Sequence, residues 1–320
     1  VNSGEILSMV SLPDFDLNKR EDISDKKFIN RSTKGVYELG SVFKTFTLAA
    51  GLQQNVIQED TLFKNLPKKI KCAGRSISEY DMDIPSSLTA EEILIRSGNI
   101  GSIKIAQKVG LENFKDFLEN LDLLNKIQFD IEEVGNPIPF KWGKCKLATS
   151  AYGHGITTTP LQLAKAYAII ANGGYKIKPT LIKKEKNLKR GEQIITKENS
   201  NKINEILRKI VTSEQGTANL ANIAGYEIAG KTGTAQKSIK GRYSKKKINT
   251  FASIFPISSP KYVLIVLLDE PKLSETYIYE YNDGKKRKII GTPFNTAGWT
   301  SVEVAKNIIE KIGPILAIKY

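Results

Sequence analysis

Three short groups of residues in this sequence carry the side chains that a serine nucleophile requires. Ser41 and Lys44 stand three residues apart, after Gly40 and at the start of an apolar stretch, so on a helix their side chains share one face. Burial among apolar residues lowers the pKa of a lysine, and a neutral amine can take the proton of a hydroxyl. The pair therefore predicts a buried, activated nucleophile, Ser41, with Lys44 as its base. The same spacing recurs in polar or strand-edge surroundings, where a solvated lysine is expected, at Ser24–Lys27, Ser244–Lys247 and Ser258–Lys261.

The other two groups occur once each. Ser97-Gly98-Asn99 follows a predicted helix, at a junction where side chains can project into a cleft, although an ordinary helix terminus has the same composition. Lys231-Thr232-Gly233 is predicted on an edge strand, where it offers a cation, a hydroxyl and a glycine that lets a substrate backbone approach. Thr234 adds a second hydroxyl and a backbone N–H. In this order the three groups are the parts expected of a serine acylation site.

The segment GYEIAGKT at 225–232 also matches the phosphate-binding P-loop pattern. A P-loop follows a buried strand and opens a helix, so that phosphate meets the helix N-terminus. Here Tyr226 and Ile228 favour a strand, and the following TGTAQKSIKGRYS disfavours a helix. The apolar run ending in Asp269 resembles an acidic magnesium strand, but the interval leaves little room for crossover helices. A P-loop NTPase is therefore a remote alternative.

The elements that must position these groups are a first strand, a long helical middle, adjacent strands and a closing helix. Alternation predicts the first strand at 4–11. Hydrophobic periodicity and capping residues such as Thr89 and Pro160 predict the helices, at 41–54, 86–99, 99–110, 111–121, 159–174, 200–216 and 300–316. Three strands are predicted late in the chain, at 225–238, 249–258 and 260–271. Short connections favour an antiparallel sheet.

We therefore expect an α/β fold of the α+β type, in which an antiparallel sheet is flanked by helices and a mainly helical lobe is inserted at about 60–215. The 320 residues, 40% of them hydrophobic, allow a substantial core. The longest apolar run, KYVLIVLLDE, is too short to span a bilayer. The chain opens on Val1 within a strand-like pattern and without a visible signal peptide, so we expect that a preceding segment has been removed.

The net charge of +14 fits an anionic partner, such as nucleic acid, a membrane surface or wall polymer, or else a surface of solvated lysines. Basic runs at 240–247 and 283–288 are interpreted as loops between strands. Neither has the interleaved aromatics of a nucleic-acid platform, so no nucleic-acid partner is expected. Two cysteines, Cys72 and Cys145, and the single His154 argue against a transition-metal cluster. Two buried free thiols are favoured, with pairing left open.

Over almost the whole chain the sequence resembles the penicillin-binding proteins, specifically the class B transpeptidase domain. The resemblance rests on GEILSMVSLPDFDLN, YELGSVFKTFTLAAGL, LTAEEILIRSGNIGSIKIAQKVG, GHGITTTPLQLAKAYAIIANGG and GYEIAGKTGTAQK. The ending TAGWTSVEVAKNIIEKIGPIL is most similar to the cell-division member. One departure is Gly98, where division enzymes commonly have a second serine. The resemblance implies the penicillin-binding-protein/β-lactamase-like fold.

The resemblance also implies the roles of the residues. Ser41 attacks the carbonyl between two terminal D-alanines of a stem peptide, and Lys44 takes its proton. Ser97 relays a proton to the leaving amine under the influence of Lys231, and Asn99 hydrogen-bonds Lys44 or the substrate amide. The remaining roles fall to the third motif: Thr232, Gly233 and Thr234 hold the substrate and its terminal carboxylate, and the backbone N–H groups of Ser41 and Thr234 form the oxyanion hole.

No metal or organic cofactor is implied. The implied setting is the periplasmic face of the bacterial cytoplasmic membrane, with an N-terminal anchor and a pedestal domain before this chain. Implied partners are peptidoglycan stem peptides, β-lactam antibiotics, a membrane glycosyltransferase and division proteins. Two alternatives stay open within the resemblance: a hydrolase of the D,D-carboxypeptidase or β-lactamase kind, and a penicillin-recognising sensor domain.

Overall fold

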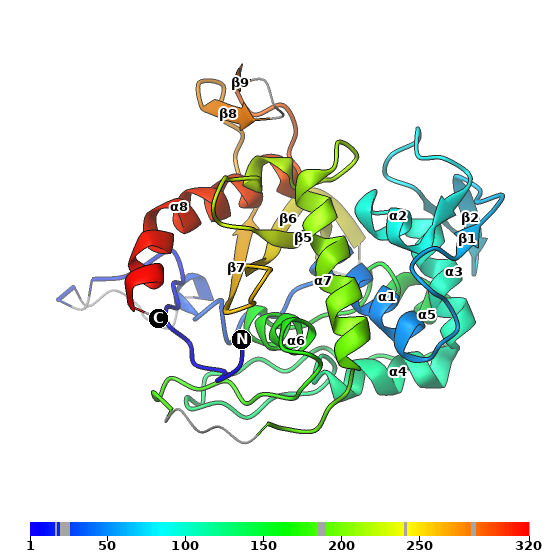
Figure 1. Ribbon diagram of the computed structural model, residues 1–320, viewed down its shortest axis with the longest axis horizontal. Coiled ribbons are helices and arrows are strands. Elements are labelled where there is room, and N and C mark those ends of the chain that lie inside the picture. The colour runs from blue at the N-terminus through cyan, green and yellow to red at the C-terminus, as the bar shows by residue number, and fades with distance from the viewer. Residues whose placement is uncertain (17, 20–25, 185–189, 240–241, 283–285, 320) are drawn as a thin grey trace.

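The strand that carries the third motif lies at the edge of an antiparallel sheet. In the computed structural model, which describes residues 1–16, 18–19, 26–184, 190–239, 242–282 and 286–319, this sheet has the order β5-β6-β7 (Figure 1). Its strands are β5 (Ala229–Ile239), β6 (Arg242–Phe255) and β7 (Tyr262–Asp269). Both pairings are antiparallel, with Lys231 opposite Ala252 and Ala252 opposite Ile265. The three predicted strands and their antiparallel arrangement are confirmed.

Helices cover both faces of this sheet. Consecutive residues of β6 from Asn249 to Phe255 are buried, and since successive side chains point to opposite faces, neither face is open there. The covering helices are α8 (Ser301–Lys319) and α6 (Pro160–Ala171), both of which contact β6 and β7. The closing helix predicted at 300–316 is therefore confirmed. Within the described residues, no helix combines the length and apolar character needed to cross a membrane.

The remaining helices follow the predicted order. They are α1 (Lys44–Gln53), α2 (Ala90–Ile95), α3 (Asn99–Val109), α4 (Leu111–Asn120), α5 (Lys144–Ser150) and α7 (Lys197–Thr212). Capping boxes start α2 and α6: Thr89 pairs with Glu92 on α2, and Thr159 pairs with Gln162 on α6. Local capping chemistry thus explains where α2 and α6 begin. Helix α5 was not predicted from the sequence.

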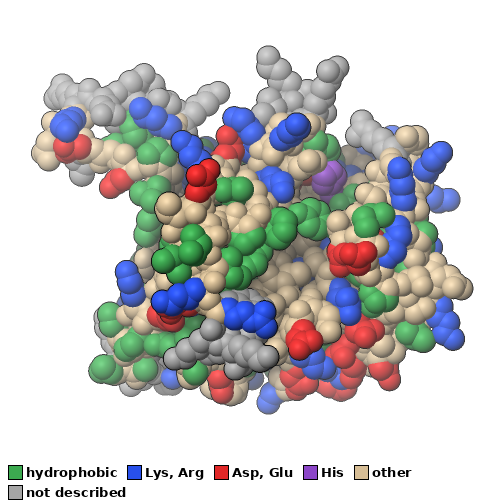
Figure 2. Space-filling view, turned by 90° about the horizontal axis from the view of Figure 1, so that it is seen from above, with side chains coloured by type: hydrophobic (Ala, Val, Ile, Leu, Met, Phe, Trp, Pro, Cys, Tyr) green, Lys and Arg blue, Asp and Glu red, His purple; other side chains and the backbone are tan. Residues whose placement is uncertain are grey.

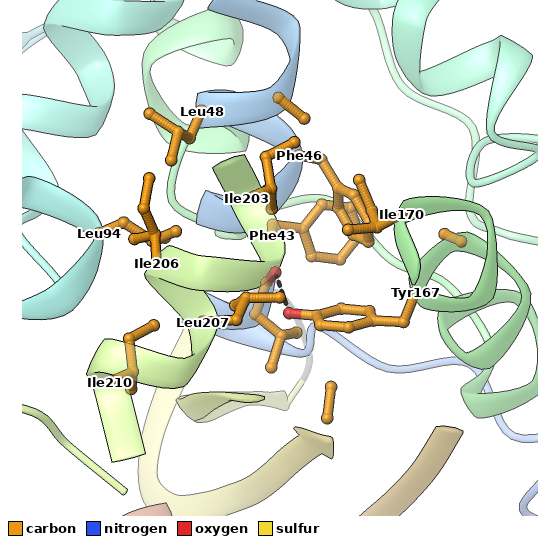
Figure 3. Packing of buried hydrophobic residues seen from close by; sticks show 14 of the residues in the cluster. Phe43, Phe46, Leu48, Leu94, Tyr167, Ile170, Ile203, Ile206, Leu207 and Ile210 are labelled. Carbon is orange, nitrogen blue, oxygen red and sulfur yellow. Dashed lines mark hydrogen bonds between the residues drawn. The ribbon is translucent and has the colours of Figure 1, made fainter. Parts of the chain in front are cut away.

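Helix α1 lies in the middle of the hydrophobic core. Its residues from Lys44 to Leu52 are buried on every side, as a helix surrounded by others must be. Figure 3 shows Phe46 packed edge-on against Tyr167, with ring centroids 5.4 Å apart. The Tyr167 hydroxyl donates to the Val42 carbonyl at 3.0 Å and lies 2.9 Å from the Thr45 hydroxyl. The turn before α1 is therefore fixed from α6.

Short strands and 3₁₀ turns complete the fold. The strands pair antiparallel as β1 (Leu62–Phe63) with β4 (Leu88–Thr89), β2 (Lys69–Cys72) with β3 (Arg75–Ser78), and β8 (Ile278–Asn282) with β9 (Lys286–Ile290). The 3₁₀ turns are η1 (Lys26–Phe28), η2 (Gly40–Phe43), η3 (Asn219–Ala221) and η4 (Ala297–Trp299). The β8–β9 hairpin projects from the rest of the molecule (Figure 1).

Two predictions about segments are wrong. The strand predicted at 4–11 has no ladder; Glu5 alone forms a bridge, to Thr180, because no neighbouring strand lies along the rest of the segment. The basic run at 240–247 is strand rather than loop from Arg242 onward, since it pairs with β5. Of the run at 283–288, residues 286–288 belong to β9, and 283–285 lie outside the described residues.

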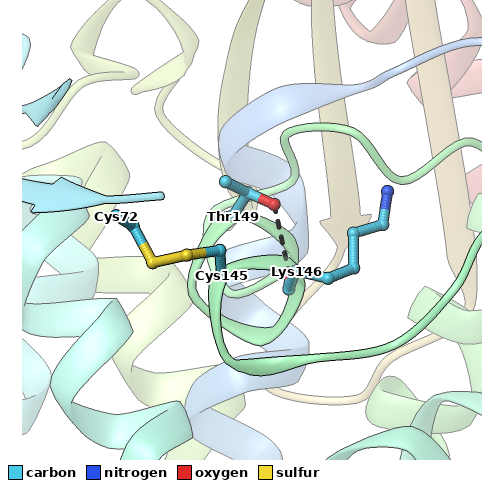
Figure 4. Close-up of a disulfide and its surroundings, with 4 residues drawn as sticks. All are labelled: Cys72, Cys145, Lys146 and Thr149. Carbon is cyan, nitrogen blue, oxygen red and sulfur yellow. Dashed lines mark hydrogen bonds between the residues drawn. A yellow bond between two sulfur atoms is a disulfide. The ribbon is translucent and has the colours of Figure 1, made fainter. Parts of the chain in front are cut away.

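The preference for two free thiols is also wrong. Cys72 and Cys145 form a disulfide, with Cα atoms 5.6 Å apart, that joins the end of β2 to the start of α5 (Figure 4). The two cysteines stand 73 residues apart in sequence, so only the assembled fold brings them together. The bond ties the β2–β3 hairpin to the helices beneath it.

Removal of this disulfide should destabilise the protein. The bond closes a loop of 73 residues, and the chain-entropy model assigns such a loop about 4 kcal/mol of the free energy of unfolding. We expect Cys72→Ser with Cys145→Ser to lower the denaturant midpoint accordingly, measured by chemical unfolding. Reductant should lower the midpoint of the wild-type chain toward that of the double variant and leave the variant unaffected. Equal midpoints for wild type and variant would contradict the prediction.

Candidate active site

The first motif spans the junction between a 3₁₀ turn and α1. Ser41 is the second residue of η2, Lys44 is the first residue of α1, and the Lys44 backbone N–H donates to the Ser41 carbonyl. Residues three apart are eclipsed in a 3₁₀ turn, so both side chains leave the same side. Gly40 enters the turn with φ of 63°, which a side chain would disfavour. Lys44 is buried as predicted, but Ser41 is only half-buried, although Gly40 and Val42 on either side of it are buried.

The second motif forms the turn between α2 and α3. Ser97 has the left-handed φ of 61°, and Gly98 is the N-cap of α3. The Lys44 amine donates to the carbonyl of Ser97 and to its hydroxyl, the latter at 3.2 Å. The Lys231 amine donates to the same hydroxyl at 2.9 Å. Two lysines from α1 and β5 therefore converge on one serine oxygen.

The third motif runs directly past the nucleophile turn. A Cβ on Gly233 would lie 2.2 Å from the Leu39 carbonyl oxygen, so only glycine fits there, and a Cβ on Gly40 would lie 3.1 Å from the Thr234 carbonyl oxygen. Glycine is thus required at 233 because the Leu39–Ser41 turn packs against it. This reason is independent of the predicted approach of a substrate backbone. The edge of β5 and the turn that carries Ser41 are therefore packed against each other and form one continuous surface.

The threonines of the third motif are held by side chains and backbone of other elements. The Thr232 hydroxyl lies 2.6 Å from that of Thr217, in the loop after α7. The Thr234 hydroxyl accepts the Ala297 N–H of η4 at 3.0 Å and keeps its own proton to donate. The hydroxyls of Thr232 and Thr234, which are predicted to bind the substrate carboxylate, are therefore held in fixed positions.

Of the two contacts predicted for Asn99, with Lys44 or with the substrate amide, the first is absent among the described residues. The Asn99 side chain donates instead to the Ser78 carbonyl at 2.8 Å. Within the described part of the chain, the Ser41 hydroxyl makes no hydrogen bond. The structure thus brings the side chains of Lys44, Ser97 and Lys231 into direct contact. Ser41 is joined to Lys44 by a backbone hydrogen bond, and the Thr234 carbonyl lies against Gly40, the residue before Ser41.

The two lysines are held in a setting that favours their neutral forms. Burial lowers the pKa of Lys44 from its usual 10.5 to about 7, although the nearby Glu79 carboxylate acts to raise it. Burial, and then the charge of Lys44, hold the pKa of Lys231 well below its usual value. Two ammonium groups on one hydroxyl repel each other, so the site readily holds one of these amines as a proton acceptor near neutral pH.

Sequence reasoning missed two side chains at this site, Glu79 and Thr217. Glu79 accepts the backbone N–H groups of Asn99 and Ile100, and Thr217 contacts Thr232. Both lie in connecting segments, and neither has a fixed spacing to the motif that it supports. No local pattern in the sequence indicates them.

The site has no P-loop. Lys231 is fully buried on a strand that continues through Thr234, and its amine faces Ser97 rather than an open phosphate cradle. The face of the molecule in Figure 2 is hollowed, with hydrophobic side chains along the hollow and both basic and acidic side chains around it. The excess positive charge does not gather into one basic patch on this face.

Comparisons with known proteins agree on one family. The family model described as the penicillin binding protein transpeptidase domain matches residues 1–295. A relative named "Probable peptidoglycan D,D-transpeptidase FtsI", from Caulobacter vibrioides, is 32% identical over 100% of this chain and 53% of its own length. The peptidoglycan D,D-transpeptidase FtsI of Escherichia coli is 30% identical over 87% of this chain and 47% of its own length. The chain thus spans about half the length of these relatives.

Solved structures give the same result for the fold. The apo structure of the TP domain of penicillin-binding protein 3 from Burkholderia pseudomallei superposes with a TM-score of 0.77 at 25% identity. The superposition covers 89% of this chain and 82% of that domain. The mixed arrangement of helices around an antiparallel sheet, predicted from the pattern of elements, is therefore confirmed.

Proposed function

This chain belongs to the penicillin-binding protein transpeptidase domain family, and from that premise we propose that it cross-links peptidoglycan stem peptides through an acyl-enzyme on Ser41. The single observation that carries the proposal is the convergence of Lys44 and Lys231 on the Ser97 hydroxyl, directly behind the Ser41 turn. An amine of lowered pKa next to a serine is the arrangement that nucleophilic acyl transfer requires.

The reaction begins with attack by the Ser41 oxygen on the carbonyl carbon between two D-alanines. The hydroxyl proton passes to neutral Lys44, and the backbone N–H groups of Ser41 and Thr234 stabilise the developing oxyanion. The bond to the leaving D-alanine nitrogen breaks as Ser97 delivers a proton to that nitrogen. An amine of a neighbouring stem peptide then attacks the ester, forms the new amide and restores the Ser41 hydroxyl.

Recognition of the donor strand falls to the edge of β5. Thr232 and Thr234 donate hydrogen bonds to the terminal carboxylate, and Lys231 adds a favourable potential behind them. In this proposal Asn99 contacts the substrate amide once its bond to the Ser78 carbonyl is exchanged. Within the segment at about 60–215, the helices and short strands other than α6 and α7, which contact the sheet, act as the lobe that closes the other side of the site.

The setting we propose is extracytoplasmic, at the septum of a dividing bacterial cell. The disulfide supports an oxidising compartment, since such bonds rarely persist in the cytosol. Relatives named FtsI support the division role. The proposed partners are the membrane glycosyltransferase that makes the glycan strands, other division proteins, and β-lactams as inhibitors that mimic the D-alanine pair.

Mass spectrometry of the intact protein after exposure to penicillin tests this function. We expect one added penicillin mass, located by peptide mapping on the segment with Ser41, and an adduct that persists for hours. Release of the adduct within minutes would instead indicate a hydrolase that passes the acyl group to water. A stable adduct without formation of cross-linked product from stem peptides and an acceptor amine would indicate a sensor domain. Absence of an adduct at Ser41 would refute the proposed function.

A further inference from the structure

Glu79 is a buried carboxylate that belongs to none of the three motifs. It follows β3 directly, the residue is only 7% exposed, and its backbone N–H donates to the Lys68 carbonyl at 2.9 Å. The hairpin that carries it is fastened to α5 by the disulfide. A charged group that is this deeply buried must be compensated by its contacts.

Those contacts are with the N-terminus of α3. One carboxylate oxygen accepts the Asn99 N–H at 2.6 Å, and the other accepts the Ile100 N–H at 2.8 Å. The N-cap of α3, Gly98, has no side chain that could accept these bonds. A serine or aspartate at the N-cap position usually supplies such a cap, but here Glu79 supplies it from another element. Its negative charge is favourable at the N-terminus of a helix.

The turn that Glu79 holds is the one that carries Ser97. The left-handed φ of Ser97 is a conformation that non-glycine residues keep only where neighbouring contacts impose it. Asn99 is bound twice by the end of the hairpin, through its backbone to Glu79 and through its side chain to Ser78. The position of the Ser97 oxygen between Lys44 and Lys231 thus depends on this attachment.

Glu79 also acts on the base of the site electrostatically. Burial lowers the pKa of Lys44, and Glu79 opposes that effect. The other charged group facing this centre among the described residues is Lys231, across the Ser97 hydroxyl. Glu79 is therefore the acidic neighbour of Lys44.

We propose that Glu79 is a positioning residue for acylation: from the end of the β2–β3 hairpin it holds the Ser97–Asn99 turn in register with Lys44 and Lys231. The kinetic part of this inference rests on the proposed acylation of Ser41. The positional part does not, because it concerns the conformation of the Ser97–Asn99 turn and the first residues of α3.

The test measures the second-order rate constant for acylation by a fluorescent penicillin against pH, for wild type, Glu79→Gln, Glu79→Ala and Glu92→Gln. Glu92 is the matched control, since it caps α2 through a capping box at the surface. We expect Glu79→Ala to be slower by about 100-fold and Glu79→Gln by about tenfold, because small displacements of catalytic groups cost rates of this order. The acid limb of Glu79→Gln should move to lower pH, since Lys44 loses a neighbouring negative charge.

Amide hydrogen exchange at Asn99 and Ile100 gives a second readout that needs no catalysis. We expect faster exchange there in Glu79→Ala and unchanged exchange in Glu92→Gln. Glu79→Gln keeps the shape of the side chain, so it serves if Glu79→Ala does not fold, and faster exchange is expected in it as well. If the wild-type chain is not acylated at Ser41, the proposed function fails, and exchange alone decides the role of Glu79.

Three results would overturn the inference. One is acylation of both Glu79 variants within about twofold of wild type. Another is unchanged exchange at Asn99 and Ile100 in a folded Glu79 variant. The third is a slower Glu79→Gln with its acid limb in the wild-type place, because a general loss of packing lowers a rate without moving that limb.

Discussion

Replacement of Ser41 by alanine should abolish covalent labelling by a fluorescent penicillin while the fold persists. The adduct needs an oxygen nucleophile at this position, and the methyl group of alanine supplies none. Within the described residues the Ser41 hydroxyl has no hydrogen-bond partner, so its removal strands no buried group. We expect a rate at least about 10⁴-fold below wild type and a free energy of unfolding within about 0.5 kcal/mol of it.

Ser258→Ala is the matched control for this experiment. Ser258 stands at the same spacing to a lysine, Lys261, but on the exposed side of the chain. Labelling followed by gel fluorescence, and unfolding in denaturant, should give wild-type values for this variant. Labelling of Ser41→Ala at a rate near that of wild type would place the nucleophile elsewhere and remove the basis of the proposed function.

The parts of the fold that were predictable are those decided by local chemistry. Helix α6 begins where Thr159 and Pro160 predict, because a capping box and a proline at the first turn act over a few residues. The edge position of Lys231 followed from three strands with short connections. In each case the deciding interactions lie within one element or between neighbours in the chain.

The parts that failed depend on distant segments. The pattern at 4–11 alternates like a strand, but a strand exists only where another strand offers its backbone, and among the described residues only Thr180 does so here. The disulfide requires β2 and α5 to lie side by side, and no sequence pattern near Cys72 or Cys145 predicts that contact. Glu79 is hidden for the same reason, since its partners begin 20 residues later, at Asn99.

The site itself lies between these two cases. The spacing of Ser41 and Lys44 predicts a shared face, and in the structure the two residues lie in one turn whose Lys44 N–H donates to the Ser41 carbonyl. The apolar stretch predicts a buried lysine, and burial lowers the pKa of Lys44 to about 7. That Lys44 and Lys231 share one oxygen of Ser97 was not predictable, because it is a contact among three elements. This contact matters chemically, since it gives the proton of the nucleophile a path from one amine through a hydroxyl toward the other.

Replacement of Lys44 by alanine should slow acylation by roughly 10²- to 10⁴-fold, the usual contribution of a general base. The hydroxyl of Ser41 then loses its proton acceptor, and Ser97 loses one of its two amine donors. Lys104→Ala, on the exposed side of α3, is the control, and its rate should equal that of wild type. A Lys44→Ala variant that is folded and acylates at the wild-type rate would contradict the assignment of the base.

The pH dependence of the wild-type rate tests the same lysine without a mutation. Burial lowers the pKa of Lys44 to about 7, so the neutral, reactive form rises as pH increases through 7 and is lost as pH falls below it. Relative to its plateau, the rate constant should be about half at pH 7 and about one tenth at pH 6. A lysine of ordinary pKa would place this limb above pH 10. Almost none of such a lysine would be neutral at pH 7. An acid limb in that higher range, in a chain that is still folded, would mean that Lys44 stays charged and that another group takes the proton.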